Sequence, residues 1–209
     1  MGQITEAPLV AGFSLGIALA GAPGPVQAVL LAESVRGGIA RGLRALAGAS
    51  LTFATLLLSL ALGVSVAPLG AVPLRILQVA GGTFLIWLAV DAFRSGHQAD
   101  ETSAPRRGLP PIARGSLAVI LNPGEWLFLA AVASPLFAET GRSTGRTGAL
   151  FAAVALIAGL AIGDGAVVLL GGLGLRRARP SVIVWTGHVL AAVLASLGVW
   201  LVIQGVTSS

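Results

Sequence analysis

The chain has 209 residues, of which 56% are hydrophobic and 10% are charged, and its mean hydropathy is +0.93. Soluble domains carry about 25% charged residues, so this chain has too few charges to cover a water-facing surface, and lipid is its expected solvent. The net charge of +5 comes from thirteen arginines without any lysine, and the chain has no cysteine. The missing cysteine excludes disulfides, thiolate metal sites and dithiol relays within the chain.

In chain order, six apolar stretches are long enough for a transmembrane helix, which needs about 20 residues. They cover residues 8–34, 44–67, 72–93, 114–138, 148–173 and 182–205. The leading residues MGQITEAP lack the basic region of a signal peptide, so the first stretch is expected to be a retained span. The sequence therefore predicts an all-α membrane protein with six transmembrane helices.

The arginines predict the topology of these helices. Ten of the thirteen lie around the loops after the first, third and fifth stretches, and the other three are Arg75, Arg142 and Arg146. Because arginine favours the cytoplasmic side of a membrane, both termini are predicted to lie outside. This explains the positive charge, so we expect no nucleic-acid partner. Trp185 and Trp200, near opposite ends of the last stretch, are predicted to anchor it at the two interfaces.

The polar, proline-rich residues 96–113 predict a cytoplasmic linker between two halves, 1–95 and 114–209. Each half holds three predicted spans. The first half begins outside and the second begins inside, so their orientations are opposite. This is the arrangement of an inverted-topology repeat.

Both halves carry a Pro-Gly pair in their first span, in GAPGPVQ at residues 21–27 and in NPGEW at residues 122–126. Pro25 lies about 16 Å from Arg36 and Pro123 about 14 Å from Arg114, at 1.5 Å per helical residue. Both prolines are thus near the middle of a core about 30 Å thick. Matched breaks of this kind mark a transporter's substrate site, so broken helices are predicted in spans one and four. The alternative is that the prolines only kink their helices.

The residues at the two breaks suit an anionic ligand group. Asn122 is a good N-cap and Pro123 a good first helical residue, so a half-helix is predicted to start there, and another after Pro25. Helix N-termini present free N–H groups and a partial positive charge, which attract a carboxylate. The predicted substrate-binding residues are Gly24, Pro25, Gln27, Asn122, Pro123, Gly124 and Glu125.

Two of these side chains have alternative roles. Asn122 and Glu125 have the spacing of a capping box, so Glu125 is either part of a helix cap or a substrate contact. Gln27 is predicted to bond either the ligand or the backbone groups freed by the break. Glu33 is three residues before Arg36, and we expect it to pair with that arginine at the interface.

Asp164 is an acid within the fifth span, about 18 Å from Arg176 along a helix. An acid at mid-membrane costs roughly 2.5–3.5 kcal/mol on insertion scales, and such residues usually face a cavity. We predict that Asp164 carries a coupling proton or acts as counter-ion to a substrate amine. The alternative is a structural hydrogen bond to a neighbouring helix.

Several motifs resemble those of a known family. The segments APGPVQAVLLAESVRGGIARGL and LAVILNPGEWLFLAAVASPLF are similar to the Pro-Gly-Pro and Asn-Pro motifs of the lysine-exporter and homoserine-exporter family of bacterial translocators, of LysE or RhtB type. Asp164 matches an acid common in that family's fifth span. The chain departs from the family at Val26, where many members have Asn, and in the second span, which carries Ser50 and Thr52 but no acid.

The resemblance implies a secondary transporter, not an enzyme, that exports an amino acid or a close derivative across the bacterial inner membrane. An inside-negative potential opposes the exit of a cation by about 2.3 kcal/mol per charge per 100 mV, so proton antiport is the expected coupling. No cofactor is expected, and two histidines without cysteine make a poor soft-metal site. The expected partners are the substrate and the lipid bilayer, and a homo-oligomer is left open. The alternatives are an exporter of a metal ion or of a cell-surface lipid precursor, and a membrane accessory protein that transports nothing.

Overall fold

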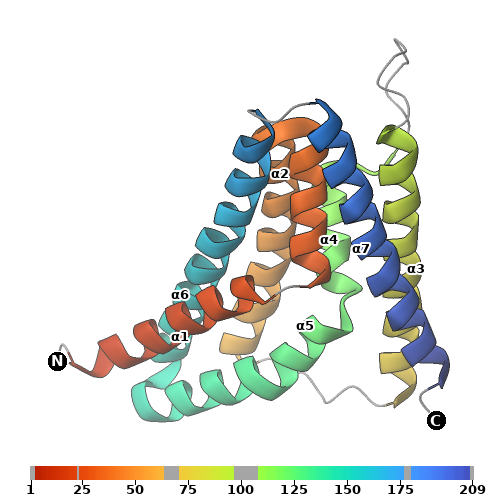
Figure 1. The fold of residues 1–209 in the computed structure, drawn as a ribbon. Coiled ribbons are helices and arrows are strands. Elements are labelled where there is room, and N and C mark those ends of the chain that lie inside the picture. Colours follow the sequence, from red (N-terminus) through yellow and green to blue (C-terminus); the bar gives the residue numbers. More distant parts are fainter. Residues whose placement is uncertain (1–2, 23, 64–70, 97–107, 177–179, 208–209) are drawn as a thin grey trace.

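The computed structural model describes residues 3–22, 24–63, 71–96, 108–176 and 180–207, and every element within them is a helix (Figure 1). The prediction of an all-α fold is therefore confirmed. The elements in order are α1 (Gln3–Gly21), α2 (Pro25–Ala61), α3 (Ala71–Gly96), α4 (Pro111–Ile120), α5 (Pro123–Phe128), the π-helix η1 (Leu129–Ala133), α6 (Ser134–Arg176) and α7 (Pro180–Thr207).

Four segments are long and apolar enough to cross a membrane: Pro25–Ala61, Ala71–Val90, Pro123–Gly174 and His188–Thr207. Two shorter apolar helices, Glu6–Gly21 and Pro111–Ile120, precede the first and third of them. By this measure the described residues hold four candidate spans, where the sequence predicted six. The difference arises because two of the four segments are long helices that bend within their length.

The bends replace two of the predicted loops. Residues 35–43 and 139–147 are helical apart from Gly37 and Gly38 in α2 and Gly145 in α6. Gly38 and Gly145 have φ angles of 71° and 73°, in the left-handed region that favours glycine. In Figure 1, α2 turns over at the end of the molecule opposite both termini, whereas α6 turns at the end where the termini lie. Of the predicted linker 96–113, residues 97–107 lie outside the described residues, and Pro111 already begins α4.

Small residues let the helices pack closely. In lipid no hydrophobic effect drives helices together, so close backbone packing has to do so. A Cβ on Gly16 of α1 would overlap the Leu156 carbonyl of α6, and Gly82 of α3 and Gly198 of α7 each lie against the other's carbonyl. The main helix pairs are α1 with α6, α2 with α6 and with α4, and α3 with α7.

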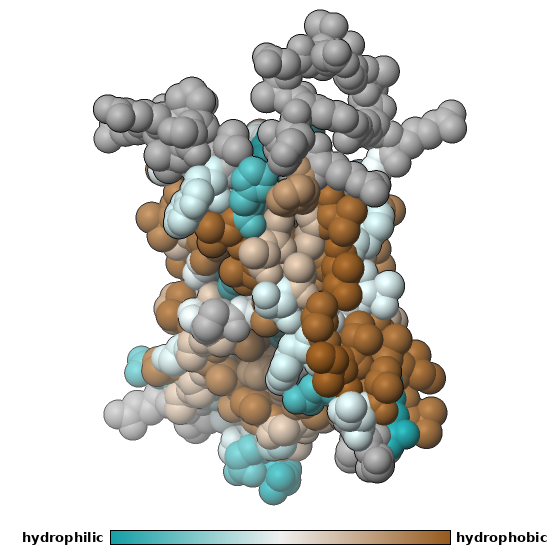
Figure 2. Space-filling model, turned by 45° about the vertical axis from the view of Figure 1, so that its right-hand side comes forward, coloured by the Kyte–Doolittle hydropathy of each residue, from teal (hydrophilic) through white to brown (hydrophobic). Residues whose placement is uncertain are grey.

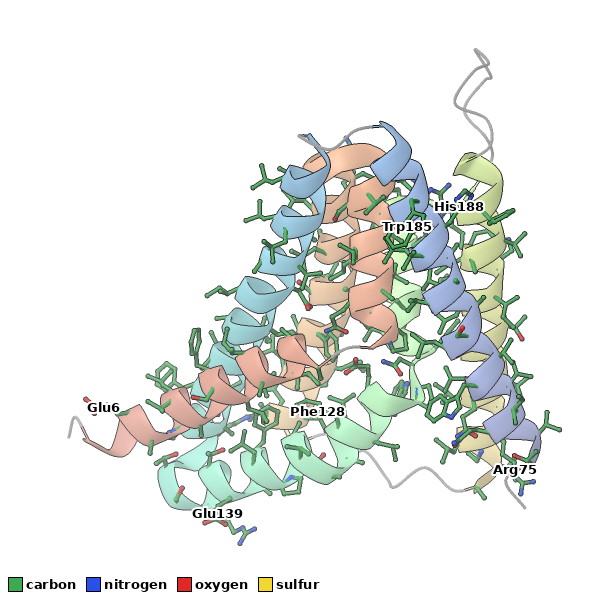
Figure 3. All side chains as sticks on the ribbon, viewed as in Figure 1. Glu6, Arg75, Phe128, Glu139, Trp185 and His188 are labelled. Carbon is green, nitrogen blue, oxygen red and sulfur yellow. The ribbon has the colours of Figure 1, made fainter. Side chains whose placement is uncertain are left out.

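The outer surface is apolar, as a lipid-facing surface requires. Figure 2 shows hydrophobic side chains, in brown, over a wide area of the visible side. Exposed aliphatic residues include Leu51, Val154, Ile162 and Leu170. Charged Glu139 and Arg75 lie at the end that holds both termini, and Trp185 and His188 lie toward the opposite end (Figure 3).

Candidate functional site

Two helices start at the predicted breaks. Gly24 is the N-cap of α2, with an extended backbone, and Pro25 is its first residue. Asn122 is the N-cap of α5, where its Oδ1 accepts a hydrogen bond from the Gly124 N–H at 3.1 Å. The helix start predicted at Pro123 is therefore confirmed, and proline suits the first position because its missing N–H would have had no partner there. The helical run from Pro123 continues through η1 into α6.

The two helix starts share one cavity of about 380 Å³. All seven residues that the sequence proposed for substrate binding line it, namely Gly24, Pro25, Gln27, Asn122, Pro123, Gly124 and Glu125. The fold thus brings together two segments separated by nearly 100 residues. The cavity volume lies at the lower end of the range for small-molecule sites.

Asp164 lies behind one wall of this cavity. Its side chain is buried in α6, and Gln27 Nε2 donates a hydrogen bond to Asp164 Oδ1 at 3.3 Å. Gln27 itself lines the cavity, so its amide connects the buried carboxylate to the cavity. Gln27 was predicted to bond either the ligand or the backbone groups freed by the break, and its hydrogen bond to Asp164 is neither of these.

Glu125 is also buried, and its two carboxylate oxygens differ in their hydrogen bonding. Oε1 accepts a hydrogen bond from Asn122 Nδ2 at 3.1 Å, whereas Oε2 has no hydrogen-bond partner among the described residues. A capping box would need Glu125 to accept from the backbone N–H of Asn122, but that N–H donates to the Val119 carbonyl. Asn122 alone caps α5, so Glu125 is not required for the cap.

Glu125 and Asp164 are close enough to interact electrostatically. None of the arginines with described side chains forms an ion pair with either carboxylate. The site therefore combines two helix N-termini, which favour an anionic group, with two carboxylates, which favour a cationic group or a proton. This combination matches a zwitterion.

A third buried acid has a different environment. Glu33 Oε2 accepts from Arg41 Nε at 2.6 Å and Glu33 Oε1 from Arg114 Nη1 at 3.1 Å, while Arg36 Nη1 is 4.0 Å away. Arg114 also stacks over the Trp87 ring at 5.3 Å. The expected ion pair with Arg36 is present at 4.0 Å, and Arg41 and Arg114 form shorter ones, because the bend in α2 and the packing of α4 bring them to Glu33. We call Glu33, Arg41 and Arg114 the arginine cluster.

Sequence reasoning missed the part of the cavity wall that comes from α3 and α7. These helices contribute Leu74, Gln78, Leu197, Trp200, Leu201 and Gln204. Gln78 and Gln204 are polar residues within apolar stretches of sequence, and this feature could have marked them as candidates for the cavity wall. Gln78 is buried, and its Oε1 has no hydrogen-bond partner among the described residues. Trp200, predicted as an interface anchor, is exposed and also lines the cavity.

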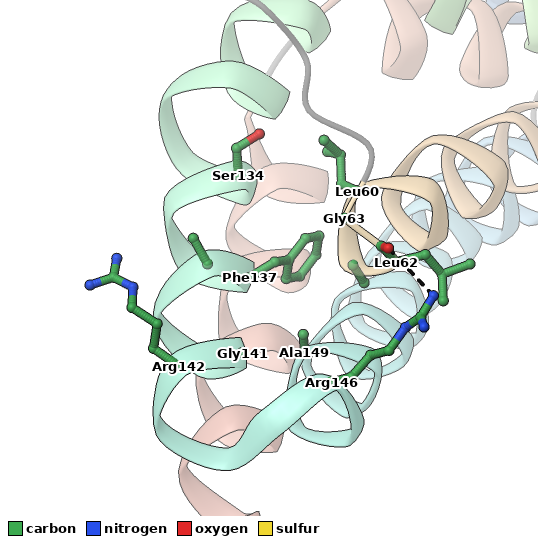
Figure 4. Close-up of a pocket in the computed structure, with 11 residues that line it drawn as sticks. Leu60, Leu62, Gly63, Ser134, Phe137, Gly141, Arg142, Arg146 and Ala149 are labelled. Atoms are coloured by element: carbon green, nitrogen blue, oxygen red, sulfur yellow. Dashed lines mark hydrogen bonds between the residues drawn. The ribbon is translucent and has the colours of Figure 1, made fainter.

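A second cavity of about 550 Å³ lies between the end of α2 and the first part of α6 (Figure 4). Phe137 and Gly141 line one side and Leu60 and Gly63 the other, and Arg146 Nη2 donates to the Leu62 carbonyl at 3.5 Å. This cavity is larger, but it includes neither helix start and no buried acid. We therefore place the candidate site in the smaller cavity.

The fold and the site define a multi-pass membrane protein with a cavity, lined by both polar and apolar side chains, inside an apolar helix bundle. The chain matches the family model of the LysE type translocators over residues 17–205 and belongs to that family. No curated protein and no solved structure matches the chain. The family resemblance inferred from the sequence motifs is confirmed, and the protein is accordingly a transporter.

Proposed function

We propose that this translocator is a secondary transporter that exports an amino acid or a close derivative across the bacterial inner membrane by proton antiport. The observation that carries the proposal is the cavity, in which two helix starts and Glu125 meet and behind which Asp164 is bonded to Gln27. Family membership supports transport, and the mixed charge of the site supports a zwitterionic substrate.

The proposal includes six membrane crossings, in two inverted repeats at residues 1–95 and 114–209. The first crossing is α1 with the part of α2 before Gly37, and the second is the rest of α2. The fourth comprises α4, α5, η1 and the part of α6 before Gly145, and the fifth is the rest of α6. Helices α3 and α7 are the third and sixth. In support, each half has one break before a proline-led helix and one glycine bend, and the arginine distribution favours both termini outside.

In this proposal the substrate carboxylate binds near the start of α2, whose N-cap Gly24 supplies no side-chain hydrogen bond, and close to the partial positive charge at the start of α5. The ammonium group binds Glu125, whose Oε2 has no partner among the described residues. A charge-assisted hydrogen bond between these groups would satisfy both of them.

Asp164 carries the coupling proton. Because it is buried behind Gln27 and has no arginine partner among the described side chains, its charge depends on proton binding rather than on a fixed counter-ion. A shift of the Gln27 side chain would connect Asp164 with the cavity. Inward movement of a proton would then drive outward movement of the substrate.

The test is counterflow of radiolabelled amino acids into liposomes that contain the purified protein, with and without an imposed pH gradient. We expect flux of at least one amino acid above that of protein-free liposomes, and stimulation by a gradient that drives protons opposite to the substrate. If no amino acid moves, amino-acid export is wrong, and the lipid-precursor and accessory alternatives become the better explanations. If the flux is the same with and without the pH gradient, proton antiport is wrong.

A further inference from the structure

The cavity has two chemically different ends. One end consists of the helix starts and Glu125, already assigned above to the amino and carboxylate groups of the substrate. The other end, which we call the α3/α7 end, consists of leucines, one tryptophan and two amides, and none of its lining residues is charged. The residues that matter most there are Leu74, Gln78, Trp200 and Gln204.

Helix packing places Leu74 and Gln78 away from the helix breaks, whereas Leu201 lies beside Pro25 and Asn122. Gly81 in α3 lies against the Leu121 carbonyl, so it marks the level of the break between α4 and α5. Gln78 is three residues and Leu74 seven residues closer to the start of α3, which corresponds to about 4.5 Å and about 10 Å along the helix. That start lies at the end of the molecule that holds both termini (Figure 1).

We propose that the α3/α7 end is a side-chain subsite that selects amino acids with uncharged side chains over cationic and anionic ones. This inference rests on the proposed function, because it assigns the remaining part of the same substrate. Because the chain departs from the family's motifs at Val26 and in the second span, the family resemblance does not specify which amino acid is the substrate. The uncharged lining of this subsite narrows the choice to amino acids with uncharged side chains.

Charge is the first argument. A cationic side chain in the α3/α7 end would lose its hydration without gaining a carboxylate, since Glu125 and Asp164 belong to the other end. The face of Trp200 attracts cations, but cation–π attraction replaces only a small part of the lost hydration. An anionic side chain would find no arginine among the lining residues. An uncharged side chain avoids both penalties.

The buried amide of Gln78 is the second argument. Its side chain lies on the cavity wall, only 9% of the residue is exposed, and its Oε1 has no hydrogen-bond partner among the described residues. Buried polar atoms normally have partners, so a polar atom without one at a cavity wall is available to bond a ligand. An amide can donate as well as accept, which suits a neutral hydrogen-bonding group. Leu74, Leu197 and Leu201 supply apolar contacts for the rest of the side chain.

The test compares counterflow of leucine, glutamine, lysine and glutamate by the wild-type protein in liposomes. We expect leucine or glutamine to move about tenfold faster or more than lysine and glutamate, corresponding to about 1.4 kcal/mol of discrimination. If lysine or glutamate moves as fast as the uncharged pair, the subsite is wrong but amino-acid transport stands. If none of the four moves but another amino acid does, the subsite is wrong and amino-acid transport stands; if no amino acid moves at all, both the proposed function and the subsite are wrong.

Variants of Gln78 sharpen the test. Gln78→Glu adds a carboxylate of nearly the same size, so it should raise the lysine-to-leucine ratio about tenfold. Gln78→Leu should lower glutamine flux while leucine flux persists. The matched control is Thr83→Val, an exposed position on the same helix, which should leave every ratio unchanged. Equal ratios in the wild-type protein and Gln78→Glu would overturn the subsite, and gel filtration of each variant identifies any that is misfolded.

Discussion

The molecule buries carboxylates in two regions with opposite surroundings. Glu33 lies in the arginine cluster, where Arg41 and Arg114 satisfy both of its oxygens. Glu125 and Asp164 lie at the cavity, where their hydrogen bonds come from the amides of Asn122 and Gln27. The two arginines oppose the charge of Glu33 and hold its carboxylate in position. In the proposed function, the acids held by amides exchange a proton or bind the ammonium group of the substrate.

This difference separates two roles that look alike in the sequence. Breaking a buried ion pair leaves an uncompensated charge in a medium of low dielectric constant, so the arginine cluster should matter for folding. Neutralising a cavity acid removes no ion pair, so it should matter for transport more than for folding. The following substitutions test that separation, from the largest expected effect to the smallest.

Asp164→Asn should reduce proton-driven flux to that of protein-free liposomes, because an amide cannot carry the coupling proton. The variant should still fold, since asparagine has nearly the same shape and can still bond Gln27. Counterflow measures the flux, and gel filtration checks the fold. Glu139→Gln, at an exposed acid, is the control and should behave as wild type. Transport by Asp164→Asn at the wild-type rate would show that the acid is structural.

Glu33→Gln should destabilise the protein by about 3–5 kcal/mol, because it leaves the buried Arg114 without its carboxylate. Denaturant titration in detergent measures this change. The contrast is Arg142→Gln, which breaks the exposed pair Glu139–Arg142 and should cost about 0.2–1 kcal/mol. If the two variants are equally stable, the arginine cluster does not matter for folding as expected.

Glu125→Gln should weaken substrate binding about tenfold, or about 1.4 kcal/mol, because the ammonium group loses its charged partner. Stability should change little, since a glutamine oxygen can still accept from Asn122. The expected signature is a raised half-saturation concentration with a smaller effect on maximal flux than Asp164→Asn has. An unchanged half-saturation concentration would place the ammonium group elsewhere.

Asn122→Ala should have the smallest effect, a loss of about 1 kcal/mol of stability, because α5 loses its N-cap. Asn122→Asp keeps the oxygen that caps Gly124 but places a third carboxylate beside Glu125. We expect it to retain the cap and to lose transport, which would separate the capping role of Asn122 from its role beside Glu125. Thermal unfolding and counterflow, measured on both variants, check these expectations.

The sequence predicted the helix starts correctly because the signal was local. Proline restricts its own backbone, and Asn122 caps through a hydrogen bond to a residue two positions away, so Pro123 and Pro25 mark helix starts in almost any fold. Asp164 was equally clear as an acid in an apolar stretch. The glycine bends were missed because a polar segment that contains arginine is typical of a loop. Gly38 and Gly145 adopt positive φ angles, so the chain turns there between two helical segments and needs no loop.

The partners of the buried groups could not be predicted in the same way. Glu33 pairs with Arg114, 81 positions away, and Gln27 with Asp164, 137 positions away. The α3/α7 end of the cavity depends on the packing of Gly82 against Gly198, which no local pattern specifies. These contacts depend on which helices lie side by side.

By itself, the sequence determined that the protein is an α-helical membrane protein, where its helices break, and which acid lies within them. Those properties follow from hydropathy and from backbone restrictions that act over a few residues. Only the tertiary structure decided which carboxylates are neutralised by arginine and which remain at a cavity, because that depends on close approach between helices far apart in the chain. The same packing placed two amides and no charge at the α3/α7 end of the cavity.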